Sequence, residues 1–348
     1  MLTRRATLAC LTALAVSGSG PALAVSASAP VLAQSGGEPF AGKTVTMVIG
    51  FGPGGGYDLW GRTLGRHIGK HLPGKPTVVP QNMPGAGSLI AANHIYSAAP
   101  KDGTVLGIIA RDAALAELTG LQGARFDARK FTWVGSPATE TNVCISYQTS
   151  KVKSAKDLFE QELIIGNTGP GTGTYTYPKA LIGLLGMKFK SIGGFPSSSD
   201  VFLAMERGEV EGICESLDSV SGKRPDWIET KKVNVLFQAG TEPNPHLKDV
   251  PFIIDLAKAE EDKQALRFLY AGQGIGRPFV APPDMPADRA KMLQDAFNAT
   301  MKDSEFIADV KKQQLELEPQ TGPQLQALLE KLYATPKPVI DKVSQLVK

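Results

Sequence analysis

The sequence predicts an α/β fold built from two Rossmann-like domains. Apolar, strand-like runs alternate with helical stretches along the chain, and glycine-rich turns join strand to helix in both halves. This alternation predicts parallel strands joined by right-handed helical crossovers. The chain has 348 residues, more than one hydrophobic core usually holds, so two domains are expected. Ligand-binding loops should then gather at the carboxyl ends of the strands.

The stretch 45–72 shows the pattern most clearly. Residues 45–49 form an apolar run, a glycine-rich turn follows, and the next residues are typical of an amphipathic helix. Apolar side chains recur at every fourth position of that helix, from Trp60 to Leu72. A strand that enters a helix through glycines leaves the first N–H groups of the helix unpaired at the turn. The sequence therefore predicts an anion site here.

The same turn also fits a dinucleotide fingerprint. Gly50-Phe51-Gly52-Pro53-Gly54-Gly55 satisfies G-x-G-x-x-G after a strand and before a helix. The fingerprint also needs an acidic residue roughly 20 residues further on, where the chain instead reads Val78-Val79-Pro80-Gln81-Asn82. Pro53 also removes one backbone donor. A smaller anion is favoured over a nicotinamide or flavin cofactor, and a glycine turn without any ligand is the third interpretation.

The alternation continues along the chain. Further strands are expected at 76–80, 104–109, 131–135, 143–147, 163–166, 210–215, 233–238 and 278–281. Helices are expected at 89–98, 113–118, from 154 onward, and at 175–185, 199–207, 255–270, 286–301 and 321–348. The loop 167–174 repeats the strand–turn–helix arrangement, with glycines that free the backbone and threonines that add hydroxyl groups. It is expected to form a second half-site, the alternative being a flexible surface loop.

An export signal opens the chain. Arg4 and Arg5 precede an uncharged run at 6–16, and Ala22-Leu23-Ala24 is a cleavage candidate, so the signal is assigned to 1–24 with cleavage possible up to about residue 34. The general secretory route is favoured over the twin-arginine route. No later segment approaches the roughly 20 apolar residues of a membrane span, so a soluble periplasmic protein is expected.

Charge argues against nucleic acid as a partner. The formal net charge is +3, and removal of Arg4 and Arg5 leaves about +1. A nearly neutral chain has no electrostatic footprint for nucleic acid or for an acidic membrane surface.

Motifs for catalysis or metal binding are missing from the sequence. His67 and His71 have a spacing that suits zinc, but no carboxylate lies between them and they alternate with basic residues. A solvated helix face is the expected explanation. There is no G-x-S-x-G, no C-x-x-C and no Walker motif, and the chain has 4 histidines. A binding protein is therefore expected rather than an enzyme, with no cofactor and no metal.

Cys144 and Cys214 each lie in an apolar, strand-like run. An oxidising compartment would allow them to form a disulfide. Cysteines in such runs are more often small buried hydrophobes, so unpaired cysteines are expected.

Several motifs follow one another in a fixed order. They are Phe51-Gly52-Pro53-Gly54-Gly55-Gly56-Tyr57-Asp58, Asn82-Met83-Pro84-Gly85-Ala86-Gly87, Ala99-Pro100-Lys101-Asp102-Gly103-Thr104, Gly169-Pro170-Gly171-Thr172 and Gly208-Glu209-Val210-Glu211-Gly212. In this order and spacing, from about residue 43 to the C-terminus, the chain resembles the periplasmic solute receptors of tripartite tricarboxylate transporters, the TctC or Bug family.

The resemblance implies a two-lobed periplasmic binding protein fold. Domain 1 is expected at 40–140 plus about 255–348, and domain 2 at 141–254. The implied protein is a monomer that closes on a small organic carboxylate, a di- or tricarboxylate or an aromatic acid, and delivers it to a membrane permease of one large and one small subunit. Two alternatives are an exported α/β enzyme with a nucleotide cofactor between Gly50 and Gly55, and a ligand receptor for a sensor kinase.

The resemblance also implies the ligand-binding residues. In the first lobe they are Pro53, Gly54, Gly55, Gly56, Tyr57, Asp58, Pro84, Gly85, Ala86, Gly87 and Ser88. In the second lobe they are Thr168, Gly169, Gly171, Thr172, Ser197, Ser198, Glu215 and Ser216. Asp58 is expected to cap the helix and fix the loop rather than to touch a carboxylate, the alternative being a direct contact with a hydroxyl or amine group of the ligand. These loops contain no obvious arginine, which is consistent with ligand binding by backbone N–H groups and bridging water. Tyr57 and Tyr175 are expected to narrow the pocket or to stack on an aromatic acid.

Overall fold

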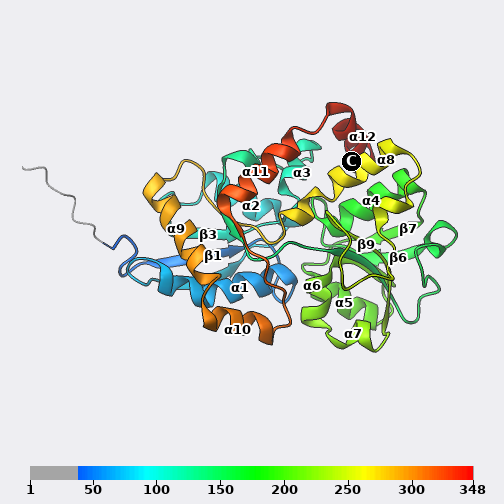
Figure 1. The fold of residues 1–348 in the computed structure, drawn as a ribbon, viewed down its shortest axis with the longest axis horizontal. Coiled ribbons are helices and arrows are strands. Elements are labelled where there is room, and N and C mark those ends of the chain that lie inside the picture. Colours follow the sequence, from blue (N-terminus) through cyan, green and yellow to red (C-terminus); the bar gives the residue numbers. More distant parts are fainter. Residues whose placement is uncertain (1–37, 348) are drawn as a thin grey trace, which may run out of the picture. The chain divides into compact units, whose positions relative to one another are not determined.

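Two separate β-sheets carry the fold of residues 38–347, the part of the chain that the computed structural model describes (Figure 1). The predicted export signal at 1–24 lies outside the described residues. Between residues 38 and 347, none of the helices combines the length and apolar character that crossing a bilayer requires.

The first sheet has six strands in the order β11-β4-β10-β3-β1-β2. Their bounds are β1 (Thr44–Ile49), β2 (Thr77–Asn82), β3 (Val105–Ile108), β4 (Thr132–Ser136), β10 (Phe279–Ala281) and β11 (Gln320–Thr321). β1 pairs in parallel with β2 and β3, as the alternation predicts, so the carboxyl ends of these strands lie at one edge. β10 is antiparallel to both β3 and β4.

The second sheet has five strands in the order β7-β6-β8-β5-β9. Their bounds are β5 (Asn142–Tyr147), β6 (Leu163–Gly166), β7 (Phe189–Ile192), β8 (Gly212–Ser216) and β9 (Val233–Ala239). β6 pairs in parallel with β7 and β8, whereas β5 is antiparallel to β8 and β9. The expectation of parallel strands is therefore wrong for β5, β10 and β11, which run antiparallel to the strands that they pair with. β5 enters the second sheet directly from β4 of the first sheet, without a helical crossover.

Twelve α-helices are found between residues 38 and 347. They are α1 (Gly56–Ile68), α2 (Leu89–Ser97), α3 (Ala113–Leu118), α4 (Gly173–Leu185), α5 (Ser198–Glu206), α6 (Leu217–Lys223), α7 (Asp226–Glu229), α8 (Glu260–Leu269), α9 (Ala287–Thr300), α10 (Ser304–Lys312), α11 (Gly322–Tyr333) and α12 (Lys337–Val347). The helix expected from residue 154 is only a 3-10 turn, Asp157–Phe159. We call each sheet with the helices that follow its strands a lobe.

Helix α1 packs on the first sheet as its pattern predicts. Trp60, Leu64, Ile68 and Leu72 are buried in one cluster with the side chains of β1. Gly61 brings the helix close to the sheet, because a Cβ atom there would lie 2.9 Å from Ile49. This packing fixes the position of the helix N-terminus above the carboxyl edge of β1.

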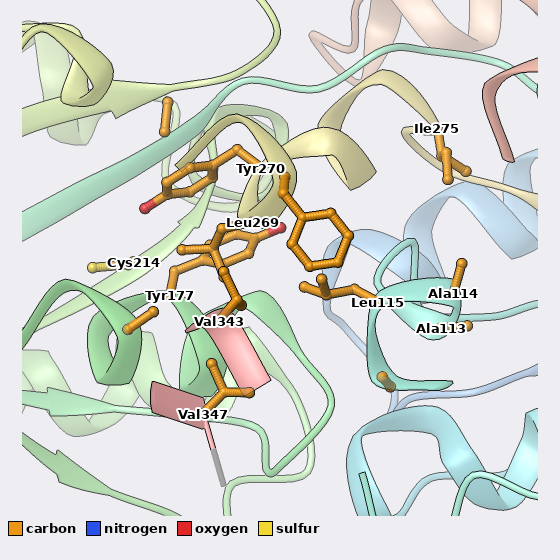
Figure 2. Close-up of a cluster of buried hydrophobic side chains, with 14 of the residues drawn as sticks. Ala113, Ala114, Leu115, Tyr177, Cys214, Leu269, Tyr270, Ile275, Val343 and Val347 are labelled. Atoms are coloured by element: carbon orange, nitrogen blue, oxygen red, sulfur yellow. The ribbon is translucent and has the colours of Figure 1, made fainter. Parts of the chain in front are cut away.

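The last helix packs on the second lobe. Val343 and Val347 of α12 belong to the same buried cluster as Tyr177 of α4 and Leu269 of α8 (Figure 2). Leu115 of α3, in the first lobe, joins that cluster, so one core connects helices of both lobes. The strands of the second sheet come from 142–239, while α8 and α12 follow later in the chain; the domain boundaries themselves stay a prediction.

A disulfide links Cys144 of β5 to Cys214 of β8. The expectation of unpaired cysteines is therefore wrong. The two residues are direct neighbours across antiparallel strands, and both side chains are fully buried. The sequence does not reveal this pairing, because the two cysteines are 70 residues apart in the chain. They become neighbours only because β5 runs antiparallel to β8.

His67 in α1 and His71 in the 3-10 turn that follows are less exposed than expected. His67 Nε2 lies 3.0 Å from the Asp309 carboxylate, and His71 Nε2 lies 2.8 Å from that of Asp303. Both partners belong to α10 or its N-cap, so these histidines attach α10 to α1. No group of His, Cys, Asp and Glu side chains suited to a metal ion is found in the part of the chain that is described.

Candidate functional site

A narrow cavity lies where loops of the two lobes meet, and we call it the inter-lobe cavity. From the first lobe it is lined by Phe51, Gly55, Gly56, Tyr57, Arg111 and Asp112. From the second lobe it is lined by Asn142, Thr168, Thr172, Gly173, Thr174, Tyr177, Ser197, Ser198 and Glu215. The centres of water-sized molecules can occupy about 20 Å³ of it, roughly the space of one or two waters.

Three helices begin at the inter-lobe cavity. Gly56, Gly173 and Ser198 are the first residues of α1, α4 and α5, and all three line it. The first N–H groups of a helix have no partner within the helix, and they carry the positive end of its dipole. Three such ends around one cavity favour an anion.

The glycine turn before α1 already uses several of its N–H groups. Gly50 N–H donates to Ile108 O (3.0 Å), Gly52 N–H to Pro196 O (3.1 Å) and Gly54 N–H to the Asp58 carboxylate (2.9 Å). These donors are therefore not available to the pyrophosphate of a dinucleotide. A Cβ atom at Gly52 would lie 3.0 Å from Pro196, so this glycine allows close contact with the second lobe.

Asp58 holds the turn before α1 in shape. Its carboxylate also accepts hydrogen bonds from Arg62 Nε (2.9 Å) and Asn82 Nδ2 (2.8 Å). Burial raises the pKa of Asp58, but the hydrogen bonds from Arg62, Asn82 and Gly54 outweigh burial and keep the pKa below its usual value. The N-cap position belongs to Gly55, so Asp58 supports the loop from within the first helical turn.

Arg111 supplies the cation that the sequence interpretation lacked. It follows β3, lines the inter-lobe cavity and is buried. Its backbone N–H and Nε donate to Tyr57 Oη (3.0 and 3.2 Å), and Nη1 donates to Gln273 Oε1 (3.1 Å). Arg111 lies outside the predicted loops, which contain no obvious arginine, so the sequence interpretation did not include it. Arg111 stands outside the glycine motifs, but a charged pair, Arg111-Asp112, directly after a buried strand was a usable signal.

Carboxylates balance the charge of Arg111. Glu140 Oε2 lies 3.3 Å from Arg111 Nη1, and Glu215 Oε1 lies 3.9 Å from Arg111 Nη2. Glu140 also pairs with Arg277, whose Nε lies 2.5 Å from Glu140 Oε1. Pairing is needed because an isolated charge is costly to bury.

Tyr57 positions this network from the first lobe. Its ring stacks on Phe51 with centroids 4.3 Å apart, and the guanidinium group of Arg277 lies 4.6 Å from the ring centroid. Burial raises the pKa of Tyr57, although Arg111 and Arg277 act in the opposite direction. The neutral hydroxyl of Tyr57 therefore accepts hydrogen bonds from Arg111.

Tyr177, rather than Tyr175, reaches the inter-lobe cavity. Tyr177 Oη donates to Asp112 Oδ1 (2.6 Å) and accepts from Gln273 Nε2 (2.7 Å). Burial raises the pKa of Asp112, and the opposite charge of Arg111 only partly offsets this. Tyr175 instead accepts a hydrogen bond from Lys179 (3.1 Å).

The hydroxyl groups of the second-lobe loops mainly hold those loops in shape. Thr168, Thr172 and Thr174 bond to one another through Oγ1, at 2.8 to 3.2 Å. Ser197 Oγ donates to Asp200 (2.7 Å). Ser216 caps α6, accepts a hydrogen bond from Arg277 and is not among the residues that line the cavity.

The predicted site residues fall into four groups. Gly55, Gly56, Tyr57, Thr168, Thr172, Ser197, Ser198 and Glu215 line the inter-lobe cavity. Pro84, Gly85, Ala86, Gly87 and Ser88 line a second hollow with Thr168 and Gly169, and Gly171 lies at a third with Tyr175. Pro53, Gly54, Asp58 and Ser216 line none of these three. The residues that line the inter-lobe cavity but were not among the predicted site residues are Phe51, Arg111, Asp112, Asn142, Gly173, Thr174 and Tyr177.

Comparison with known proteins begins with sequence. No family model matches the chain. The UPF0065 protein in the tcbD-tcbE intergenic region of Pseudomonas sp. strain P51 is 26% identical over 239 residues, which cover 63% of this chain and 65% of that protein. The chain thus spans less than two thirds of the curated relative that it matches.

Solved structures resemble most of the chain. The periplasmic binding protein BugD matches with a TM-score of 0.67 at 18% identity, covering 87% of this chain and 96% of BugD. MatC from Rhodopseudomonas palustris, with bound malate, matches with a TM-score of 0.67 at 20% identity, covering 88% and 99%. A TctC solute-binding protein from Polaromonas matches with a TM-score of 0.57 at 17% identity, covering 86% and 98%.

BugD is described as a periplasmic binding protein, and the Polaromonas protein as a solute-binding protein. Identities of 17 to 20% support a conclusion about the fold. The two mixed α/β sheets of this chain, with a cavity between their loops, correspond to the two lobes of such proteins. The chain therefore has the two-lobed fold of the Bug and TctC periplasmic solute-binding proteins, as the resemblance of its sequence motifs predicts.

Proposed function

We propose that this protein is a periplasmic receptor that captures a small organic carboxylate in the inter-lobe cavity. One observation carries the proposal: the guanidinium group of Arg111 and the N-termini of α1, α4 and α5 converge on a single buried cavity. Charge-assisted hydrogen bonds from such donors to a carboxylate are short and strong. They gain further strength where the protein excludes water.

Two solved structures of similar fold support a small organic carboxylate as the ligand class. MatC is described with bound malate, and a second Rhodopseudomonas palustris protein of the same fold is described with adipate. Both ligands are dicarboxylic acids. This chain presents strand-to-helix turns from two lobes to one cavity.

Capture is proposed to occur by lobe closure. Hydrogen bonds connect the lobes at the inter-lobe cavity. Gly52 N–H donates to Pro196 O (3.1 Å), Ser199 Oγ donates to Gly54 O (2.6 Å), and Tyr177 Oη donates to Asp112 Oδ1 (2.6 Å). With these bonds formed the cavity has little free volume, so entry of a ligand requires the lobes to separate. Closure then brings both halves of the site onto the ligand.

Delivery is proposed to involve a membrane permease of one large and one small subunit, as in tripartite tricarboxylate transporters. The Bug and TctC fold and the export signal expected at 1–24 support this role. A test is uptake of a labelled acid in cells that contain the permease, with and without this protein. Uptake that does not depend on the protein would contradict the transport role but not ligand binding.

The ligand class is tested by thermal unfolding of the purified protein with mono-, di- and tricarboxylates, aliphatic and aromatic, and with NAD and ATP as controls. A ligand at about 100 times its dissociation constant adds about 2.7 kcal/mol of stability. The melting temperature should then rise by a few degrees with one class of acid. A rise with NAD or ATP alone would contradict the proposal and favour the nucleotide-binding enzyme.

A further inference from the structure

We propose that the protein has a second binding site, for an amphipathic anion with one carboxylate head group and an unbranched apolar chain. The site is a groove lined by α8, α11, α12 and the 3-10 turns Ile253–Leu256 and Ala271–Gly274, and we call it the α8–α11 groove. The centres of water-sized molecules can occupy about 520 Å³ of it. That volume lies in the range typical of sites for small organic ligands.

The α8–α11 groove is separate from the inter-lobe cavity, and the two share no lining residue. The 3-10 turn Ala271–Gly274 contributes to both sites through different residues. The side chain of Gln273 bonds to Arg111 (3.1 Å) and Tyr177 (2.7 Å) at the inter-lobe cavity. Ala271 and Gly274 line the groove instead. A ligand in the groove therefore does not use the groups that are proposed to hold a carboxylate in the inter-lobe cavity.

Apolar side chains form the walls of the groove. All of them belong to the hydrophobic core that connects helices of both lobes, or pack against it. They are Ile254, Phe268, Ile275, Leu328, Leu332 and Val339. Ile275 is drawn with other members of that core in Figure 2. An apolar chain that lies along these walls removes apolar surface from water, which favours binding.

The charge at the groove selects the other end of the ligand. Among the described residues that line it, Arg267 of α8 and Lys331 of α11 are the charged ones, and both are cationic. Arg267 pairs with Glu260 at 2.9 Å. Lys331 is exposed and forms no ion pair within residues 38–347. An exposed ammonium group beside an apolar groove favours a ligand with an anionic end and disfavours a cationic one.

An unbranched alkanoate meets both conditions. Its chain covers the apolar walls, while its carboxylate stays at the exposed edge beside Lys331. Thr241 and Thr335 also line the groove and provide hydroxyl donors for the carboxylate. A short dicarboxylate lacks the apolar chain, so the ligand of the groove differs from the acid proposed for the inter-lobe cavity.

Calorimetric titration with hexanoate, octanoate and decanoate, each below its micelle concentration, tests this on the unmodified protein. Each added pair of methylene groups should tighten binding about tenfold, because burial of one methylene group corresponds to roughly a three- to fourfold gain in affinity. Octylammonium should bind several-fold more weakly than octanoate. Affinity that does not depend on chain length, equal affinity for octanoate and octylammonium, or no binding of any alkanoate would overturn the inference. None of these results affects the proposed function, which concerns the other cavity.

Two variants locate the bound alkanoate. Lys331→Gln removes the charge and should weaken octanoate binding several-fold while leaving the affinity for uncharged 1-octanol unchanged. Thr335→Trp places a large side chain in the groove and should abolish binding of both. Lys302→Gln is the matched control, because Lys302 is exposed between α9 and α10 and should leave both affinities unchanged. Octanoate binding that neither groove variant weakens would place the ligand elsewhere and overturn the inference.

Sedimentation of the unliganded protein tests a different occupant of the groove. A monomer is expected, with the groove open to the alkanoate. A dimer that Thr335→Trp dissociates would overturn the inference, because a second copy of the chain would then cover the groove.

Discussion

Residues from several distant parts of the chain hold the Arg111 side chain in position. Tyr57 in α1, Gln273, Glu140 between the sheets and Glu215 in β8 all contact its guanidinium group or balance its charge. A buried network of this kind keeps a charged group in one geometry before any ligand arrives. It also explains why the sequence motifs alone could not reveal the cation, because its partners meet only in the folded chain.

The glycine turns, by contrast, could be predicted from sequence. Gly55, Gly56 and Tyr57 follow a strand, precede a helix and line the inter-lobe cavity as that local pattern suggests. Pro84 to Ser88 have an equally clear turn pattern but line a neighbouring hollow. Local sequence gives the conformation of a turn, whereas the packing of the lobes decides which turns share a cavity.

Asp58 gives a prediction about stability and pH. Asp58→Asn keeps the size of the side chain but removes its charge, and at pH 7 it should lower the free energy of unfolding by about 1–2 kcal/mol, since hydrogen bonds to Gly54, Arg62 and Asn82 weaken. The folded-state pKa of Asp58 is below its unfolded value, so its contribution is present above about pH 4 and is lost as pH falls through the lowered pKa.

Urea unfolding at pH 7 and at pH 3 measures this effect. The difference between the original protein and Asp58→Asn should shrink at the lower pH. A difference that stays the same at both values would show that the charge of Asp58 contributes nothing.

Among the elements, β1 and α1 were predictable because their apolar periodicities are long and regular. Strand β7 was missed, since Phe189–Ile192 is a short strand at the sheet edge with three exposed residues and no alternation. Helix α10 was also missed; its N-cap, Asp303, follows α9 after only two residues. Short elements depend on their neighbours for stability, so their sequence patterns are weak.

The disulfide between β5 and β8 gives a prediction for the second lobe. Replacing both Cys144 and Cys214 by alanine should lower the free energy of unfolding by about 2–4 kcal/mol, because the unfolded chain loses a cross-link. Denaturant unfolding in oxidising buffer measures the difference. Unfolding of the original protein with a reductant is the control and should give nearly the stability of the double variant. Equal stability of all three samples would mean that the bond does not form.

At the scale of the whole molecule, the two lobes contact each other at Gly52 as well as around the inter-lobe cavity. Gly52 lies against Pro196, and a Cβ atom there would be 3.0 Å from the proline side chain and 3.2 Å from its carbonyl oxygen. With a side chain at this position, the closed arrangement of the lobes would require Pro196 to shift by a few tenths of an ångström. The requirement concerns the relation of two lobes, so it could not be deduced from either lobe's sequence.

Gly52→Ala should consequently weaken ligand binding several-fold while changing the melting temperature of the unliganded protein little. Gly65→Ala is a matched control on α1, where a Cβ atom would make only ordinary contact, 3.7 Å from Val78. The affinities of the two variants are compared by calorimetric titration with the acid that gives the largest rise in melting temperature. Full affinity in Gly52→Ala would mean that the observed contact between the lobes is not needed for closure.

The claim that the inter-lobe cavity binds a carboxylate is tested most directly by calorimetric titration. The acid that gives the largest rise in melting temperature is titrated into the original protein, Arg111→Gln and Arg111→Lys. Arg207→Gln is the control, because Arg207 is exposed on the second lobe. If Arg111 and the helix N-termini bind the carboxylate, Arg111→Gln should weaken binding about tenfold or more, and Arg111→Lys should have an intermediate affinity because it keeps the charge but loses the planar fork. Unchanged affinity in a folded Arg111→Gln protein would contradict the claim that this cavity is the carboxylate site.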